Sequence, residues 1–319
     1  PALLCGNAAV LKASEDTPQT ALAFARLAAE AGLPPGVLNV VHGFGAGAHL
    51  VADERVGAIT FTGSNATGRK IHAAVGVGRR VQLELGGKNP VVVLADADLD
   101  AAAAVVARSS FSLTGQACTG AGRILVDRRV HDELVERVVA IAAGYTLGPG
   151  DDPATTMGPL VDANAVSAME AAVHEATGAG ATVVCGGERA ADGPLVDGCF
   201  FPPTVLVDVA HDARLARDEV FGPVIGFERV DDLDAAIAAA NAVDYGLSAA
   251  ICTRDLAAAQ KFAAEVQAGM VRVNRPTVGA AFNAPFGGIK QSGTGTHKEQ
   301  LGPTVMDFYT VSRTVWLGS

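Results

Sequence analysis

The stretch Arg80-Val-Gln-Leu-Glu-Leu-Gly-Gly-Lys-Asn-Pro-Val-Val-Val-Leu94 contains two strand patterns separated by a pair of glycines. Residues 80–85 and 90–94 are short apolar runs of the kind that form buried strands. Gly86 and Gly87 interrupt them, because glycine weakens a strand and permits a turn or a close backbone approach. We therefore predict a domain boundary here, with residues 1–86 in one domain and residues 87–289 in a second.

Strand and helix patterns alternate on both sides of this boundary. Before it, the sequence predicts strands over 37–41, 56–61 and 80–85 and helices over 21–30, 49–52 and 65–75. After it, strands are predicted over 90–94, 123–127, 181–185, 204–209, 248–253 and 270–274, and helices over 97–110, 131–144, 163–177, 233–242 and 256–266. Such alternation is typical of parallel sheets with crossover helices. The predicted fold class is α/β, with two doubly wound Rossmann-like units.

The C-terminal segment, residues 290–319, is predicted to return to the first domain. Within it, the pattern over Asp307 to Trp316 favours an edge strand suited to pairing across a subunit boundary. We therefore expect an oligomerisation tail and a homo-oligomer, either a dimer or a tetramer.

The composition excludes several classes of function. The 319 residues are 49% hydrophobic, and 24 basic residues face 34 acidic ones, which argues against a nucleic-acid partner because such binding needs clustered Lys and Arg. No apolar run approaches the length of a membrane helix, and no signal segment is visible. The five cysteines are irregularly spaced with no His close by, so we expect no metal site, a reduced cytoplasmic setting and no membrane association.

Cys118 is the cysteine whose surroundings favour chemistry. It lies in Leu113-Thr-Gly-Gln-Ala-Cys-Thr-Gly-Ala-Gly-Arg123, where small residues leave room for a substrate carbon and backbone N–H groups can stabilise an oxyanion. A nucleophilic thiol also needs help to lose its proton. The alternative for a lone cysteine is a small buried apolar side chain.

Glu84 is the second candidate catalytic residue. It lies between two leucines at the end of an apolar strand and before two glycines. Partial burial would raise the pKa of its carboxyl toward the range of a general base. The alternative is a strand-edge carboxylate that faces water.

Two further patterns are compatible with nucleotide binding, although each has an ordinary structural explanation that the local sequence favours. In Phe61-Thr-Gly-Ser-Asn-Ala-Thr-Gly-Arg69 a strand ends, Gly63 makes a turn, and Ser64 begins a helix whose N–H groups can accept a phosphate. Upstream, Lys12 and Glu15 leave a strand in an arrangement that can bind ribose hydroxyls. The alternatives are an ordinary capped helix and two solvated charges.

Eight motifs in this order resemble those of the NAD(P)-dependent aldehyde dehydrogenase superfamily. The resemblance spans the chain and rests on Pro1-Ala-Leu-x-x-Gly-Asn7, Leu11-Lys-x-x-Glu15, Phe61-Thr-Gly-Ser-x-x-x-Gly-Arg69, Leu83-Glu-Leu-Gly-Gly-Lys88, Gly115-Gln-x-Cys-Thr119, Met157-Gly-Pro-Leu160, Asp218-Glu-Val-Phe-Gly-Pro-Val224 and Ala284-Pro-Phe-Gly-Gly-x-Lys-Gln-Ser-Gly293.

The resemblance implies an oxidoreductase that converts an aldehyde to a carboxylic acid. Cys118 would be the nucleophile that forms a thioester, and Glu84 would activate the water that hydrolyses it. The implied cofactor contacts are Lys12 and Glu15 for the adenine ribose, Gly63 and Ser64 for the pyrophosphate, and Glu219 and Phe221 for the nicotinamide ribose. A carboxylate at Glu15 would repel a 2′-phosphate, so NAD is favoured over NADP.

The implied substrate is a small aldehyde. Residues around Cys118 and the segment 274–279 are similar to the branch that oxidises semialdehydes such as 2,5-dioxopentanoate, also called α-ketoglutaric semialdehyde. By that resemblance Arg275 or Thr277 would contact a distal carboxylate, and Phe286 would line the substrate pocket. The alternative for Arg275 is a solvated or structural role.

The family also has a Trp-Asn-containing stretch, which supplies an oxyanion-binding Asn, upstream of the segment similar to Pro1–Asn7. We therefore expect these 319 residues to be the C-terminal part of a longer enzyme, with an incomplete cofactor domain. Loss of one oxyanion donor costs on the order of a hundredfold in rate. The remaining alternatives are a CoA-acylating enzyme, which the Glu at position 84 argues against, an inactive nucleotide-binding remnant, and a cysteine hydrolase of unrelated fold.

Overall fold

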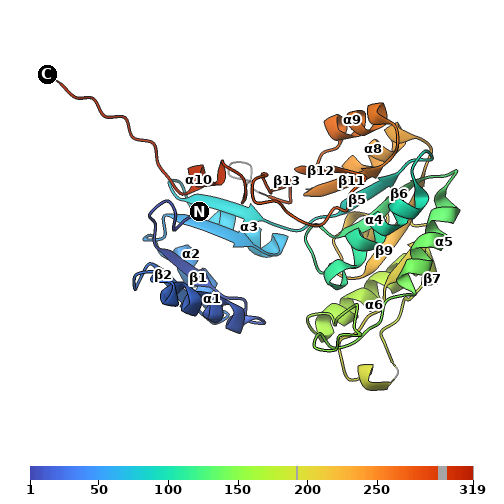
Figure 1. Ribbon diagram of the computed structural model, residues 1–319, viewed down its shortest axis with the longest axis horizontal. Helices are drawn as coiled ribbons and strands as arrows, with labels where there is room; N and C mark the ends of the chain where they lie inside the picture. Colours follow the sequence, from blue (N-terminus) through green and yellow to red (C-terminus); the bar gives the residue numbers. More distant parts are fainter. Residues whose placement is uncertain (192, 294–299, 319) are drawn as a thin grey trace. The chain divides into compact units, whose positions relative to one another are not determined.

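The computed structural model describes residues 1–191, 193–293 and 300–318 and divides into two compact units (Figure 1). Unit 1 comprises Pro1–Leu83, Ala281–Phe286 and Thr296–Ser319, and unit 2 comprises Glu84–Ala280 and Gly287–Gly295. The division thus begins at Glu84 rather than after Gly86. The segment 281–286, which the sequence placed in the second domain, belongs to unit 1.

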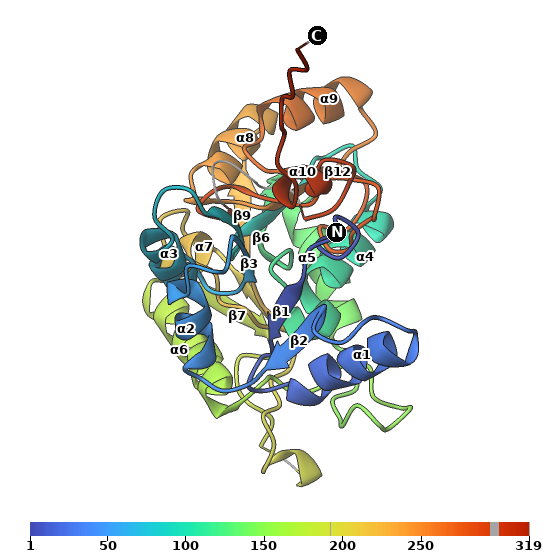
Figure 2. The same ribbon diagram turned by 90° about the vertical axis from the view of Figure 1, so that its left-hand side faces the viewer.

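Unit 1 contains two pairs of strands with helices between them. In the first pair, β1 (Ala9–Lys12) and β2 (Leu38–Val41) run parallel, and α1 (Pro18–Glu30) connects them, as Figure 2 shows. In the second pair, β3 (Ala58–Thr62) lies beside β4 (Arg80–Glu84), and α3 (Asn65–Ala74) connects them. A short helix, α2 (Ala46–Ala52), joins the two pairs. The helices and strands predicted for this part of the sequence are all present.

Unit 2 is built on a seven-stranded sheet in the order β12-β11-β5-β6-β9-β8-β7. Its strands are β5 (Asn89–Val93), β6 (Ala121–Asp127), β7 (Thr182–Cys185), β8 (Thr204–Val207), β9 (Val224–Val230), β11 (Ser248–Cys252) and β12 (Met270–Val273). Neighbouring strands are parallel except β7 and β8. Its main helices are α4 (Leu99–Phe111), α5 (His131–Ala142), α6 (Ala163–Gly178), α8 (Leu233–Asn241) and α9 (Leu256–Glu265), with the short α7 (Arg214–Arg217) before β9.

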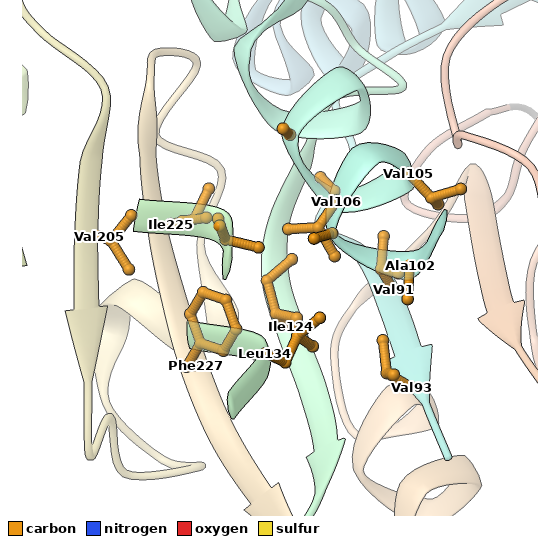
Figure 3. Close-up of a cluster of buried hydrophobic side chains, with 14 of the residues drawn as sticks. Val91, Val93, Ala102, Val105, Val106, Ile124, Leu134, Val205, Ile225 and Phe227 are labelled. Atoms are coloured by element: carbon orange, nitrogen blue, oxygen red, sulfur yellow. The ribbon is translucent and has the colours of Figure 1, made fainter. Parts of the chain in front are cut away.

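Helices cover both faces of this sheet. Val91 and Val93 of β5 point into a core shared with α4 and α5, which Figure 3 shows in close-up. The alternate residues Val92 and Leu94 pack on the opposite face against α8 and α9. Because successive strand residues face opposite sides, a strand buried on both faces must be apolar throughout. The predicted doubly wound architecture is confirmed for this unit.

The sequence interpretation missed β9, although it lies inside the sheet between β6 and β8. Gly226, Glu228 and Arg229 interrupt its apolar pattern. Glu228 is nevertheless only 1% exposed, because Arg123 of β6 donates two hydrogen bonds to its carboxylate, from Nε at 2.5 Å and Nη2 at 2.8 Å. A buried charge with a matched partner is compatible with a central strand.

The C-terminal segment, predicted as an edge strand for pairing between subunits, forms no strand within this chain. Val305–Phe308 form a short helix, α10, and residues 309–318 have no strand assignment. A lone edge strand has no hydrogen-bond partners of its own, and no described strand pairs with this segment. Elsewhere in the described ranges, no helix combines the length and the apolar character that crossing a membrane requires.

Candidate active site

Cys118 lies in the loop that leads from α4 into β6. A short 3-10 turn, η1 (Ser112–Gly115), begins the loop and contains three successive residues in the left-handed region: Leu113 at φ 53°, Thr114 at 57° and Gly115 at 70°. A side chain at Gly115 would collide with the carbonyl of Gly222. The loop can therefore lie against the Gly222 backbone only because residue 115 is glycine.

Asn89, the first residue of β5, holds the loop at the nucleophile itself. Its Nδ2 donates hydrogen bonds to the carbonyls of Cys118 and Gly120, both at 2.8 Å, while its Oδ1 accepts one from the N–H of Ser248 at 2.9 Å. Asn89 is 1% exposed. A buried amide with three bonds fixes the backbone on either side of the thiol.

The Met157-Gly-Pro-Leu160 motif holds the beginning of the loop. Thr114 Oγ1 donates to the carbonyl of Gly158 at 3.1 Å, and Gln116 Nε2 donates to that of Pro159 at 3.3 Å. Gln116 Oε1 in turn accepts from the N–H of Val161 at 2.9 Å. Two motifs that are far apart in sequence therefore form one structural element.

Glu84 ends β4 and is buried, with 1% of its surface exposed. Its backbone forms an antiparallel bridge with Gly293, and the N–H of Leu85 donates to the carbonyl of Ser292 at 2.9 Å. The strand then passes close to the loop, because a Cβ placed on Gly87 would come within 2.6 Å of the Cys118 carbonyl oxygen. The water-facing alternative for Glu84 does not hold.

Burial and two carboxylates raise the pKa of the Cys118 thiol above its ordinary value. Burial is the largest cause, followed by the charges of Glu219 and of Glu84. Opposing hydrogen bonds come from the backbone of Thr119 and of Cys118 itself. The thiol is therefore protonated at neutral pH and needs a base to become a nucleophile.

Glu219 and Phe221 lie on the loop before β9. The carboxylate of Glu219 accepts a hydrogen bond from the N–H of Gly87 at 3.0 Å, and burial raises the pKa of this carboxyl. Phe221 is 46% exposed and has a φ of 59°. A cavity of about 20 Å³ is lined by residues of this loop and of the Cys118 loop, and Glu219, Phe221 and Lys88 contribute to its lining.

The remaining predicted cofactor residues lie in unit 1. Ser64 caps α3, and its Oγ accepts from the N–H of Thr67 at 3.3 Å. The side-chain space at Gly63 is taken by the ring of Phe61. Lys12 and Glu15 form an ion pair at 2.6 Å, which lowers the pKa of Glu15. These two charges thus pair with each other.

The three residues predicted for the substrate pocket have different environments. Arg275 is exposed, as in its solvated alternative. Thr277 is fully buried: its N–H donates to Ser109 Oγ of α4 at 3.1 Å, and its carbonyl accepts from Ser248 Oγ at 3.0 Å. Phe286 is half-buried and belongs to unit 1. Over the described ranges, no group of three His, Cys, Asp or Glu residues is arranged to hold a metal ion.

Sequence reasoning missed Asn89, Gln116 and Lys88 as site residues. Asn89 and Lys88 were available in the quoted stretch, as two polar residues directly before a fully apolar strand. Gln116 lies two residues before Cys118, but its partner loop begins more than forty residues later. No local signal indicates that contact.

The fold and the site together define a doubly wound α/β protein with a candidate cysteine nucleophile in a glycine-lined loop. The chain belongs to the aldehyde dehydrogenase family, whose model matches residues 1–315. The family membership that the eight motifs implied is therefore confirmed.

The known relatives to which this chain is similar are longer than the chain itself. It is 43% identical over 319 residues to the alpha-ketoglutarate semialdehyde dehydrogenase of Haloferax volcanii, and the match covers 99% of this chain and 66% of that protein. A putative aldehyde dehydrogenase from Burkholderia cenocepacia is similar at a TM-score of 0.96 and 41% identity. The match covers 99% of this chain and 65% of the other. A betaine aldehyde dehydrogenase from Staphylococcus aureus, solved with NAD+, is similar at a TM-score of 0.91 and 34% identity. That match covers 96% of this chain and 60% of the other. The chain thus spans about two thirds of the relatives' length or less.

Proposed function

We propose that this chain carries the catalytic site of an NAD-dependent aldehyde dehydrogenase, with Cys118 as nucleophile and Glu84 as base. The observation that carries this proposal is that Glu84 is buried and that Gly87, three residues further on, lies against the Cys118 carbonyl. The charge of Glu84, after burial and the charge of Glu219, also raises the pKa of the Cys118 thiol. A carboxylate held inside the fold near the nucleophile can take a proton from the water that hydrolyses the thioester. The hydrogen bond from Asn89 to the Cys118 carbonyl holds the Cys118 loop in place, and the glycine at 87 lets the chain that follows Glu84 lie close to that loop.

In the proposed reaction, the Cys118 thiol loses its proton to solvent, its sulfur bonds to the aldehyde carbon, and the carbonyl electron pair moves to oxygen. The Cys118 N–H is the backbone donor proposed for that oxyanion. NAD+, when bound, supplies the hydride acceptor that turns this species into a thioester. Glu84 then takes a proton from water as the water oxygen attacks the thioester carbon. The C–S bond then breaks, the carboxylic acid leaves, and Cys118 remains on the protein as a thiolate.

The residues of each unit fit the proposed cofactor. In unit 1, Ser64 leaves other first-turn N–H groups of α3 for a phosphate, and Lys12 and Glu15 offer a donor and an acceptor for a ribose. In unit 2, Glu219 is proposed to accept a hydrogen bond from the nicotinamide ribose, next to Phe221. The carboxylate at position 15 supports NAD over NADP, because it repels a 2′-phosphate.

The proposed substrate is a semialdehyde such as 2,5-dioxopentanoate. The Haloferax volcanii relative, named for a semialdehyde, supports this choice. Arg275 supports it too, because among the described residues no carboxylate forms an ion pair with this arginine or with Arg272. Burial, and after it the charge of Arg275, lowers the pKa of Arg272. Two cations without a protein anion favour a substrate carboxylate. Thr277 is better explained as an anchor of this segment.

We also propose a cytoplasmic homo-oligomer. Five free cysteines support a reducing compartment. Val311, Val315, Trp316 and Leu317 are between 67% and 92% exposed, and such an apolar tail is suited to contact with another subunit.

NADH formation, followed by absorbance at 340 nm, tests the proposed function. The chain is mixed with NAD+ and 2,5-dioxopentanoate, with and without CoA. Cys118→Ala should produce no NADH, whereas Glu84→Gln should release about one equivalent and then stall, because Gln keeps the shape but cannot accept a proton. Steady turnover of Glu84→Gln, activity of Cys118→Ala, or no NADH from the unaltered chain with any aldehyde would each contradict the proposal. A requirement for CoA would establish the acylating alternative.

A further inference from the structure

Lys88 is a buried cation that the proposed reaction does not use. It is 3% exposed and lies between Gly87, which donates to Glu219, and Asn89, which holds the Cys118 loop. Its ammonium lies over Gly122, where a Cβ would come within 2.8 Å of Nζ. The glycine at 122 therefore leaves the space that the ammonium occupies.

Burial and four charged groups influence the ionisation of Lys88. Arg123 of β6 and Glu228 of β9 act on it with opposite signs, and these two are already paired with each other. Glu219 and Asp218 favour the ammonium form, while burial, the largest influence, lowers the pKa of Lys88 to about 8. Lys88 is thus still mainly charged at neutral pH.

Glu219 lines the same cavity as Lys88. The cavity of about 20 Å³ that they line has room for about one water molecule. Burial favours the neutral form of the Glu219 carboxyl, whereas the Gly87 N–H and the Lys88 charge favour the carboxylate. Two adjacent residues, Gly87 and Lys88, therefore act on the same side chain.

We propose that Lys88 is a positioning residue that keeps Glu219 ionised and held on the Gly87 amide, ready to accept a hydroxyl of the cofactor ribose. The ribose part of this inference rests on the proposed function, while the link between Lys88 and Glu219 does not. The Gly-Lys pair thereby connects the strand that delivers Glu84 to the residue that binds cofactor. A neutral Glu219 would lose the acceptor strength that a charged group gives to a hydrogen bond.

The link is tested by a ¹³C NMR titration of the glutamate carboxyl groups in the 319-residue chain. Glu219→Gln identifies the Glu219 signal by its loss. Lys88→Met removes the charge but keeps the length of the side chain, and Lys88→Arg keeps the charge. The Glu219 titration midpoint should rise by about one pH unit in Lys88→Met and stay near its original value in Lys88→Arg. An unchanged midpoint in a folded Lys88→Met variant, as judged by circular dichroism, overturns the proposal.

The consequence for the cofactor is tested by calorimetric titration with NAD+ at pH 6 and pH 8. Lys88→Met should bind up to about tenfold more weakly at pH 6 and recover toward pH 8, because the ionised form binds and the midpoint has moved upward. In a Glu219→Gln background, Lys88→Met should add nothing. Equal weakening at both pH values would show a merely structural role and overturn the proposal. If the unaltered chain binds no NAD+ while the NMR shift is present, the proposed function fails and the link stands.

Discussion

Replacing Asn89 should destabilise unit 2 and release the Cys118 loop. Asn89→Ala removes three hydrogen bonds from a side chain that is 1% exposed. At roughly 1 kcal/mol each, with a further cost for the Ser248 N–H left buried without a partner, the loss is about 3 to 5 kcal/mol. That is a large share of the roughly 5–15 kcal/mol that stabilises a domain.

Asn241 provides a matched control in the same unit. Its Nδ2 donates to the carbonyl of Glu265 at 2.9 Å and its Oδ1 accepts from the N–H of Gln267 at 2.7 Å, but it is partly exposed. Water can replace both bonds, so Asn241→Ala should cost about 1 kcal/mol or less. Urea unfolding monitored by circular dichroism compares the two variants, and equal midpoints would refute the reasoning.

The thiol gives a second measure of the same perturbation. Burial is the largest cause of the raised pKa of Cys118, so a loosened loop should lower that pKa and speed its alkylation by iodoacetamide at pH 8. Mass spectrometry of the Cys118 peptide measures the rate. Asn89→Ala should react faster than the unaltered chain, and Asn241→Ala should not. Slower or unchanged labelling in Asn89→Ala would mean that the asparagine does not hold the loop.

Two more predictions concern the same loop. Because the carboxylates of Glu219 and Glu84 raise the pKa of Cys118, Glu219→Gln and Glu84→Gln should each shift the pH midpoint of Cys118 alkylation downward, and a midpoint that stays in place in both would remove these charges from the site. Gly115→Ala should lower the free energy of unfolding by roughly 2 kcal/mol or more, because residue 115 has a φ of 70° and its side chain would meet the Gly222 carbonyl. Gly150→Ala, with no atom within 4 Å of the added Cβ, should change it by less than about 0.5 kcal/mol, and similar unfolding midpoints for the two alanine variants would count against this explanation.

Local sequence signals predicted the parts of the fold that local physics determines. The run Val91-Val92-Val93-Leu94 is apolar at every position, so a strand buried on both faces was expected, and β5 is such a strand. The strand β9 was not predicted, because a buried glutamate at position 228 is acceptable only when Arg123, 105 residues earlier in the sequence, pairs with it. The C-terminal segment failed for the converse reason, since a good strand pattern does not supply a partner strand.

The candidate site follows the same division. Cys118 and Glu84 were predicted as candidates from their glycine-rich and leucine-flanked surroundings, which are local. Their mutual electrostatic influence and the role of Asn89 depend on the pairing of β5 with β6 and β11, which no single stretch encodes. For Lys12 and Glu15 the sequence offered ribose binding or two solvated charges. The structure instead pairs the two charges with each other, at partly exposed positions.

The buried pair of Arg123 and Glu228 also bears on how β9 finds its place in the sheet. Arg123 is aligned with Gly226 across the β6–β9 boundary, two residues from Glu228. Sliding β9 by one residue would turn its side chains to the opposite face and leave each charge buried alone, at a cost of several kcal/mol. Pairing of apolar residues tolerates such slippage far better. The two charges therefore fix the register of β9 against β6. We expect substitutions at these two positions to occur together in evolution or not at all.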